Sequence, residues 1–279
     1  MPLGPAARLA SADQGLFGPG SVTWRIMAEP VVWVAGFRAL YLQALHPRVM
    51  RATWQNTSFA DRSQAWGRFV RTADFVRTRT YGSRAEVERA GRRVRRIHAS
   101  LTGTDADGST IRLDEPELLL WVHCAEIASY ADIARRGIRL QAADLDAFVD
   151  EQRRGAAVVG IDPASAPATV GELDAYFGRL RPRLHAGAEA RKALLASWNP
   201  PVPPAYLPLK LAVPPLTTLA FASLPRWARR LYGAPGSPLT DAAATAALIA
   251  AHQSATRIPP RLLFLPAALA PGPGRFGQS

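Results

Sequence analysis

The segment from Leu118 to Tyr130, LLLWVHCAEIASY, constrains the fold more than any other part of the sequence. It belongs to a longer predicted helix, which opens with a capping box between Asp114 and Glu117 and stops at Gly137. Apolar residues cover almost every side of this helix, so none of its faces is suited to water. Such a helix must lie in the middle of the molecule, with other helices around it.

A second segment, PVVWVAGFRALYLQAL, is also apolar nearly all round. It ends at His46-Pro47 because a proline disfavours helical geometry in the residue before it. Most of the remaining chain shows helical periodicity, and no apolar alternation is long enough to build a sheet. The turn-rich sequence GTDADGST predicts at most a short hairpin. We therefore expect an all-α, single-domain, multi-helix bundle with little or no sheet.

We expect residues 1–20 to form a flexible N-terminal arm, residues 21–265 the helical domain, and residues 266–279 a disordered tail. The proline run NPPVPP predicts a sub-boundary near residues 199–204, because it can form neither a helix nor an inner strand. The apolar, proline-rich residues 205–233 follow it. They could pack on the core, line a hydrophobic entry or touch a membrane surface peripherally, and interior packing is the interpretation that we adopt.

The chain has a formal net charge of +12, and nearly all of the positive charge is arginine, because lysine occurs only at Lys192 and Lys210. The arginines are spread over most predicted helices, which is typical of a biased base composition, and no nucleic-acid motif is present, so we expect no nucleic-acid partner.

Cys124 is the single cysteine, which excludes an intramolecular disulfide and fits a cytoplasmic location. The apolar run from Val31 to Leu45 is shorter than the roughly 20 residues of a membrane span, and no signal peptide is evident. We expect a soluble protein.

The helix predicted from Ser83 to Leu101 carries the most distinctive chemistry. Ser83 and Glu86 form a capping box at its start. His98 lies on its apolar face. Arg95 precedes it by three residues, so the two side chains are close enough to contact the same group. The helix therefore directs an imidazole to the interior with a cation beside it. The other predicted members of the buried face are Val87, Ala90, Gly91, Val94, Ile97 and Leu101.

Three histidines, His46, His98 and His123, lie on or beside apolar helices, whereas the loop motifs of many common enzymes are absent. A single histidine of this kind is more often a core residue with a hydrogen-bond partner. Three together favour a cofactor, because neutral imidazole is the commonest metal ligand and helical bundles build sites from inward side chains. Acidic residues at ligand spacing are scarce, which favours haem over a di-iron carboxylate centre. In a haem site the imidazole binds iron, and arginines pair with propionates or donate to bound oxygen.

Four segments carry a family resemblance, in the order LQALHP, WGRFVRTADFV, YGSRAEVERAGRRVRRIHASLTG and LDEPELLLWVHCAEIASYAD. They resemble the bacterial oxygenase family that includes the rubber-cleaving latex clearing proteins and the fungal MpaB oxygenase. The likeness covers about residues 30–232 and is strongest between 40 and 136. It implies an all-helical protein that binds a b-type haem through one histidine and uses dioxygen to cleave a carbon–carbon double bond in an isoprenoid chain.

The same resemblance implies roles for single residues. The match R-x-x-H places the family's haem histidine, and so the iron ligand, at His98 and its neighbouring arginine at Arg95. The distal polar group of the rubber-cleaving branch is similar to Arg68, Arg71 and Thr72, with Arg71 where that branch has a lysine.

We therefore expect a haem-dependent oxygenase that acts on a small lipophilic substrate, unsaturated or isoprenoid, because apolar helices surround the site. In this interpretation His46 and His123 line the cofactor pocket. Two alternatives stay open: an enzyme in which His46, His98 and His123 hold a single non-haem metal, and a cofactor-free helical protein that binds apolar ligands.

Overall fold

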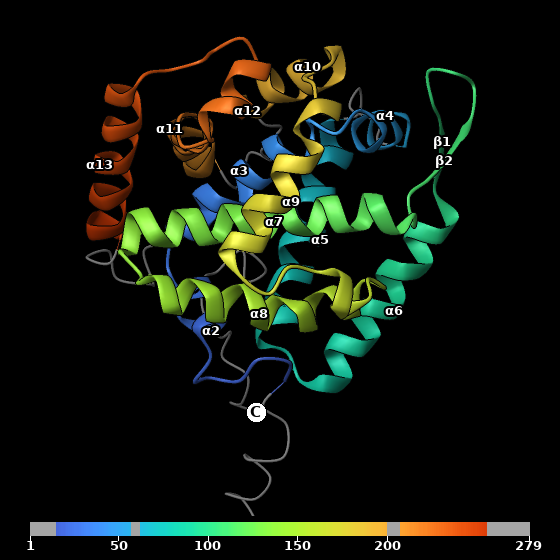
Figure 1. Cartoon of the computed structure of the whole chain (residues 1–279), viewed down its shortest axis with the longest axis horizontal. Coiled ribbons are helices and arrows are strands. Elements are labelled where there is room, and N and C mark those ends of the chain that lie inside the picture. The colour runs from blue at the N-terminus through green and yellow to red at the C-terminus, as the bar shows by residue number, and fades with distance from the viewer. Residues whose placement is uncertain (1–14, 57–61, 200–206, 256–279) are drawn as a thin grey trace, which may run out of the picture.

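The computed structural model describes residues 15–56, 62–199 and 207–255, and these are mostly α-helical, which confirms the predicted fold class (Figure 1). The α-helices are α2 (Val22–Met27), α3 (Val32–Gln43), α4 (Pro47–Gln55), α5 (Arg62–Tyr81), α6 (Arg84–Ser100), α7 (Pro116–Ile133), α8 (Ala142–Val158), α9 (Val170–Leu180), α10 (Ala188–Ser197), α11 (Leu207–Ala222), α12 (Arg226–Leu231) and α13 (Pro238–Ala255). A π-helical turn, η1 (Ala134–Ile138), continues α7, and two 3₁₀ turns are η2 (Pro163–Ser165) and η3 (Arg181–Arg183). The predicted hairpin is present: β1 (Thr102–Thr104) pairs with β2 (Thr110–Arg112) in antiparallel register.

Helix α7 crosses the middle of the molecule, with α3, α8 and α9 packed against it (Figure 1). Trp121 and Ile127 are fully enclosed on different sides of α7, as expected for a helix that is apolar all round. The predicted capping box at its start is wrong, because Glu115 is the N-cap residue and its side chain accepts from no N–H of the first turn of α7. Asp114 instead accepts hydrogen bonds from the Arg112 guanidinium at 2.7 and 2.9 Å.

Helices α3 and α4 meet at His46-Pro47, where the sequence predicts a break. Pro47 occupies the first position of α4, and His46 is its N-cap residue. The end of α3 is fixed to α7 by two hydrogen bonds. Trp121 Nε1 donates to the carbonyl of Gln43 at 3.1 Å, and Gln43 Nε2 donates to the carbonyl of Val122 at 3.1 Å. Two helices that are apolar nearly all round therefore form the centre of the bundle.

The predicted chain ends and sub-boundary are only partly described. Residues 1–14 of the predicted arm, the predicted tail at 266–279 and most of the stretch 199–204 lie outside the described residues. Phe17 is buried beneath the guanidinium of Arg154, so the packed structure includes this part of the predicted arm. On either side of the proline run, α10 packs on α4 and α11 packs on α3.

We expect residues 205–233 to pack in the interior, but only one side of α11 is buried. Val213 and Ala220 are buried, but Leu211 is 78% exposed. Among the described residues, no helix combines the length and the apolar character that crossing a membrane requires.

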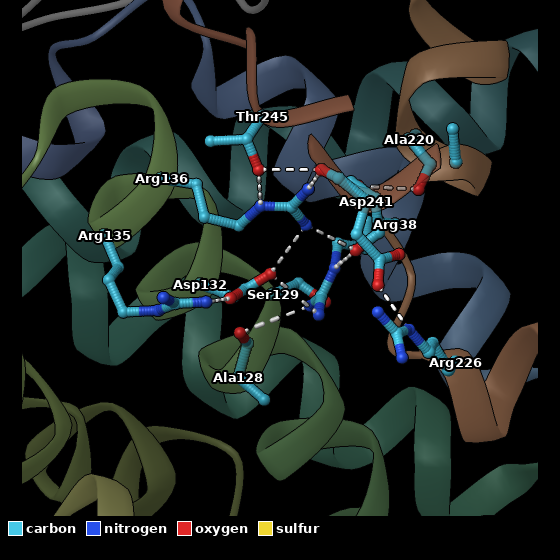
Figure 2. Close-up of polar contacts among 12 residues, drawn as sticks. Arg38, Ala128, Ser129, Asp132, Arg135, Arg136, Ala220, Arg226, Asp241 and Thr245 are labelled. Atoms are coloured by element: carbon cyan, nitrogen blue, oxygen red, sulfur yellow. Dashed lines mark hydrogen bonds and ion pairs between the residues drawn. The ribbon is translucent and has the colours of Figure 1, made fainter. Parts of the chain in front are cut away.

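Buried arginines join the last helices to the central pair. We call Arg38, Asp132, Arg136, Arg229 and Asp241 the arginine network (Figure 2). Arg38 and Arg136 each lie 3.3 Å from a carboxylate oxygen of Asp132. Arg136 also donates to the backbone carbonyl of Asp241 at 3.1 Å, and the carboxylate of Asp241 pairs with Arg229. One connected set of charges thus links α3, α7, η1, α12 and α13.

We expect Asp132→Asn to lower the free energy of unfolding by about 3 kcal/mol, because it leaves the buried Arg38 without its carboxylate. Urea unfolding at pH 7 measures this loss. The matched control is Asp150→Asn, which breaks an exposed ion pair to Arg153 and should change stability little. Equal losses in the two variants would show that the network does not stabilise the fold.

Candidate functional site

Helix α6 carries the predicted iron ligand, and its start is built as the sequence predicts. Ser83 Oγ accepts from the N–H of Glu86, and Glu86 Oε2 accepts from the N–H of Ser83 at 2.8 Å. Val87 and Gly91 are buried against the body of the protein. The prediction that Ile97 is buried is wrong, because its side chain is 44% exposed in the last turn of α6.

His98 is half-buried near the end of α6. Its Nδ1 is enclosed by protein and has no hydrogen-bond partner among the described residues. Burial lowers the pKa of His98, and the positive charge of Arg68 lowers it further, against a smaller opposite effect of Asp114. The imidazole is therefore neutral at pH 7, which is the form that binds a metal ion.

Arg68, Arg71 and Thr72 lie along one turn of α5, which packs on α6. Of the three, Arg68 is the one whose charge lowers the pKa of His98. Loss of surrounding water lowers the pKa of the Arg68 guanidinium, and the charge of Arg71 lowers it further. Thr72 Oγ1 donates to the backbone carbonyl of Arg68 at 3.0 Å, so the hydroxyl oxygen can act towards a further group only as an acceptor. The charge of one arginine of α5 thus acts on the neutral His98, and the side chains of Arg71 and Thr72 are exposed.

An aromatic cluster adjoins this turn of α5. The ring of Phe69 stacks on Phe37 of α3 with centroids 5.6 Å apart, and it lies 6.1 Å from the ring of Trp33. All three side chains are half-buried. The polar residues of α5 therefore stand next to an apolar wall that α3 and α5 build together.

Arg95 has a defined contact of its own. Its Nη1 donates to the backbone carbonyl of Val158 at 2.5 Å, at the last residue of α8. Arg95 also lies against Gly160, where a Cβ would come within 3.2 Å of its Cδ. This arginine fixes α6 to the end of α8, three residues before His98.

His123 lies in a different environment, in the middle of α7. It is buried, and its Nδ1 has no hydrogen-bond partner among the described residues. Burial lowers the pKa of His123 to about 4, with smaller and opposed effects from Glu126 and Arg79. Arg79 and Glu126 form a buried ion pair at 2.7 Å between α5 and α7. This pair was not predicted from the sequence, although Glu126 is the single acid in the apolar segment from Leu118 to Tyr130 and so signals a buried cation.

His46 forms a third environment, at the start of α4. It is buried, its ring centroid lies 5.9 Å from that of Trp121, and burial lowers its pKa to about 4. Across the described residues, which include all three histidines, no group of three His, Cys, Asp or Glu side chains is placed to hold a metal ion. The alternative of a single non-haem metal held by His46, His98 and His123 is therefore wrong.

A surface cavity of about 390 Å³ lies between the start of α7 and α9. Its lining includes Glu117 and Arg183, which form an ion pair at 2.7 Å, and the apolar side chains of Leu120 and Leu180. None of the residues predicted for the functional site lines it.

Comparison with known proteins gives one match. A family model described as the catalytic domain of ER-bound oxygenase mpaB/B′ and rubber oxygenase matches residues 24–254. This range contains every residue predicted for the functional site. No curated protein and no solved structure matches the chain.

The contact between α6 and α8 leaves no room for a side chain at position 91, where a Cβ would lie 2.8 Å from the carbonyl oxygen of Val158. We expect Gly91→Ala to lower the free energy of unfolding by about 1–3 kcal/mol through overpacking. Gly178→Ala in α9 is the control. Its Cβ would meet nothing within 4 Å, so it should raise stability by about 0.5–1 kcal/mol. Thermal unfolding of both variants measures the difference, and a stabilised Gly91→Ala would contradict the close approach of the two helices.

The buried histidines predict a loss of stability in mild acid. The pKa of His123 is about 4 in the folded protein, against about 6.5 in the unfolded chain. The unfolded state therefore binds the proton more tightly, so the full stability is present above pH 6.5 and declines as the pH falls towards 4. In urea unfolding over this range, His123→Gln should show a shallower decline than the parent protein. His185→Gln, at an exposed position, should keep the parental slope. Identical slopes for all three proteins would contradict a buried, neutral His123.

Proposed function

Because the chain belongs to the family of mpaB and rubber-oxygenase catalytic domains, we propose that it is a haem-dependent oxygenase. The family is one of oxygenases, and the further proposals are a b-type haem, dioxygen as co-substrate, and a small lipophilic substrate that is unsaturated or isoprenoid. The observation that carries the proposal is the neutral imidazole of His98 beside the cationic turn of α5.

His98 is the iron ligand in this proposal. Its surroundings fit haem because the imidazole is neutral, its enclosed Nδ1 has no partner among the described residues, and a cation lies beside it. His123 fits less well, since the cation nearest to it, Arg79, is already paired with Glu126. When bound, the haem would supply the iron at which dioxygen is activated.

Arg68, Arg71 and Thr72 are the proposed catalytic residues. A guanidinium donates hydrogen bonds but has no lone pair to offer a metal. Arg71 therefore acts only as a donor, although the rubber-cleaving branch has a lysine at this position. The hydroxyl of Thr72 gives its hydrogen to the carbonyl of Arg68, so it serves as an acceptor. Together these groups would orient oxygen or a haem propionate and hold a proton near it.

Arg95 is proposed as a positioning residue, which acts on His98 by fixing α6 to Val158. His46 and His123 would line the cofactor pocket as neutral groups. The aromatic cluster on α3 and α5 supports a lipophilic substrate, because aromatic rings give the large apolar contact that such a ligand needs. We also propose a cytoplasmic location, which the buried, free thiol of Cys124 supports.

The absorption spectrum of the purified protein, with haem added if it is colourless, tests the proposal. We expect a Soret band in the parent protein, its loss or strong reduction in His98→Ala, and its retention in the control His185→Ala. Oxygen consumption with an unsaturated lipid then tests the activity.

Two outcomes would contradict the proposal. A protein that stays colourless and takes up no haem would favour the cofactor-free protein that binds apolar ligands. A Soret band that survives in His98→Ala and is lost in His123→Ala would place the ligand on α7.

A further inference from the structure

The side of α6 that faces solvent is lined with arginine. Val87 and Gly91 mark the buried side, where α6 packs on α5 and α8. The opposite side carries four exposed arginines, Arg89, Arg92, Arg93 and Arg96. Their spacings of three, four and seven residues place them on one face of the helix. We call these four residues the α6 arginine face.

Most of the charge on this face is not neutralised within the protein. Helix α6 has two acidic residues. Glu86 is held in the capping box, and Glu88 lies 3.5 Å from Arg92 in an exposed ion pair. The other three arginines of the face form no ion pair among the described residues. Like charges four residues apart on a helix repel one another, so this grouping does not stabilise α6. It is suited to a partner that carries negative charge.

The α6 arginine face lies behind His98, the proposed iron ligand. His98 follows the buried Gly91 by seven residues, so it lies on the opposite side of α6 from the arginines. The thickness of one helix, roughly 10–12 Å, therefore separates the face from the imidazole. Complexes for electron transfer are small, and they depend on complementary charge for rapid encounter. A cationic face at this position fits a partner that brings electrons.

We propose that the α6 arginine face docks an acidic one-electron carrier protein. The proposal rests on the proposed function, because it gives this partner a role at a haem held by His98. The reduced carrier gives one electron to ferric iron, so the carrier is oxidised and the iron becomes ferrous, the state that binds dioxygen. The planar guanidinium groups of the face would bind carboxylates of the carrier.

The charges and their position favour such a carrier over other occupants. A bilayer would need apolar side chains among the arginines, but Ile97 is the only large exposed one on α6, every residue of which the structure describes. A second copy of the chain would set arginine against arginine if the two faces met. The continuous phosphates of a nucleic acid would also meet Glu88. A carrier can place its carboxylates opposite the arginines alone, and it accounts for the position behind His98.

Binding of an acidic iron–sulfur ferredoxin tests the docking. Isothermal titration measures it on the full chain as purified, whether or not haem is present. We expect binding that weakens as the salt concentration rises. A test variant that reverses three charges should weaken this binding about tenfold or more at low salt. The test variant combines Arg89→Glu, Arg93→Glu and Arg96→Glu.

The matched control variant combines Arg191→Glu, Lys192→Glu and Arg230→Glu. These residues are also exposed, and they lie on α10 and α12, far from α6 (Figure 1). Both variants change the net charge equally, so the control isolates the effect of position. It should change the binding by about twofold or less. Thermal unfolding of each variant shows that it is folded.

A second measurement tests the delivery of the electron. Anaerobic stopped flow follows the reduction of ferric haem by the reduced ferredoxin at the Soret band. The test variant should be reduced about tenfold or more slowly than the parent protein at low salt. A small uncharged reductant should reduce both proteins at the same rate, because it needs no docking surface.

The proposal is overturned if the parent protein does not bind the ferredoxin, if the test variant binds it as well as the parent, or if the control variant loses as much binding. Equal slowing with the small reductant would place the effect at the cofactor and would also overturn it. Salt-sensitive retention on DNA without ferredoxin binding would overturn it in favour of a nucleic acid. Docking can fail while a Soret band that is lost in His98→Ala supports the proposed function. If no haem is taken up, the proposed function fails and the electron step fails with it, whatever the titration shows.

Discussion

The middle of α7 has no side that faces water, so each polar group on it needs a partner inside the protein. Those partners come from other helices. Glu126 pairs with Arg79 of α5, Ser129 accepts from Arg38 of α3, and Trp121 donates to the end of α3. The few polar side chains on α7 thereby determine which helices pack against it. His123 differs from the others because its Nδ1 gains no such partner among the described residues.

Many of the arginines have a structural role in this fold. Many arginines donate to backbone carbonyls that a helix cannot pair within itself. Arg95 reaches the carbonyl of Val158 at the end of α8, Arg229 that of Ala222 at the end of α11, and Arg136 that of Ser223 just beyond it. A guanidinium has five donors in a planar fork, so it can serve a carbonyl and a carboxylate at once. A positive net charge is therefore compatible with a protein in which much of that charge is engaged internally.

Sequence reasoning identified the elements better than their neighbours. The breadth of apolar cover on α7, the proline after His46 and the capping box at Ser83 are local signals, and each predicted what the structure has. The errors have different origins. Asp114 does not cap α7 because it binds Arg112, two residues before it, and Ile97 is exposed although the apolar pattern places it on the buried face. A distant contact decides the site, because the sequence could select His98 and Arg68 as candidates, but only the packing of α5 on α6 places one beside the other.

The contacts of Arg38 bear on how the chain reaches this state. Its hydrogen bonds join it to Ala128, Ser129 and Ser223, which follow it in the sequence by 90, 91 and 185 residues. A nascent chain that has just completed α3 thus holds a cation whose partners have not yet been synthesised. The N-terminal helices cannot settle as a separate unit, because closing such long loops precedes the gain from these contacts. Folding should therefore be completed only after most of the chain has left the ribosome.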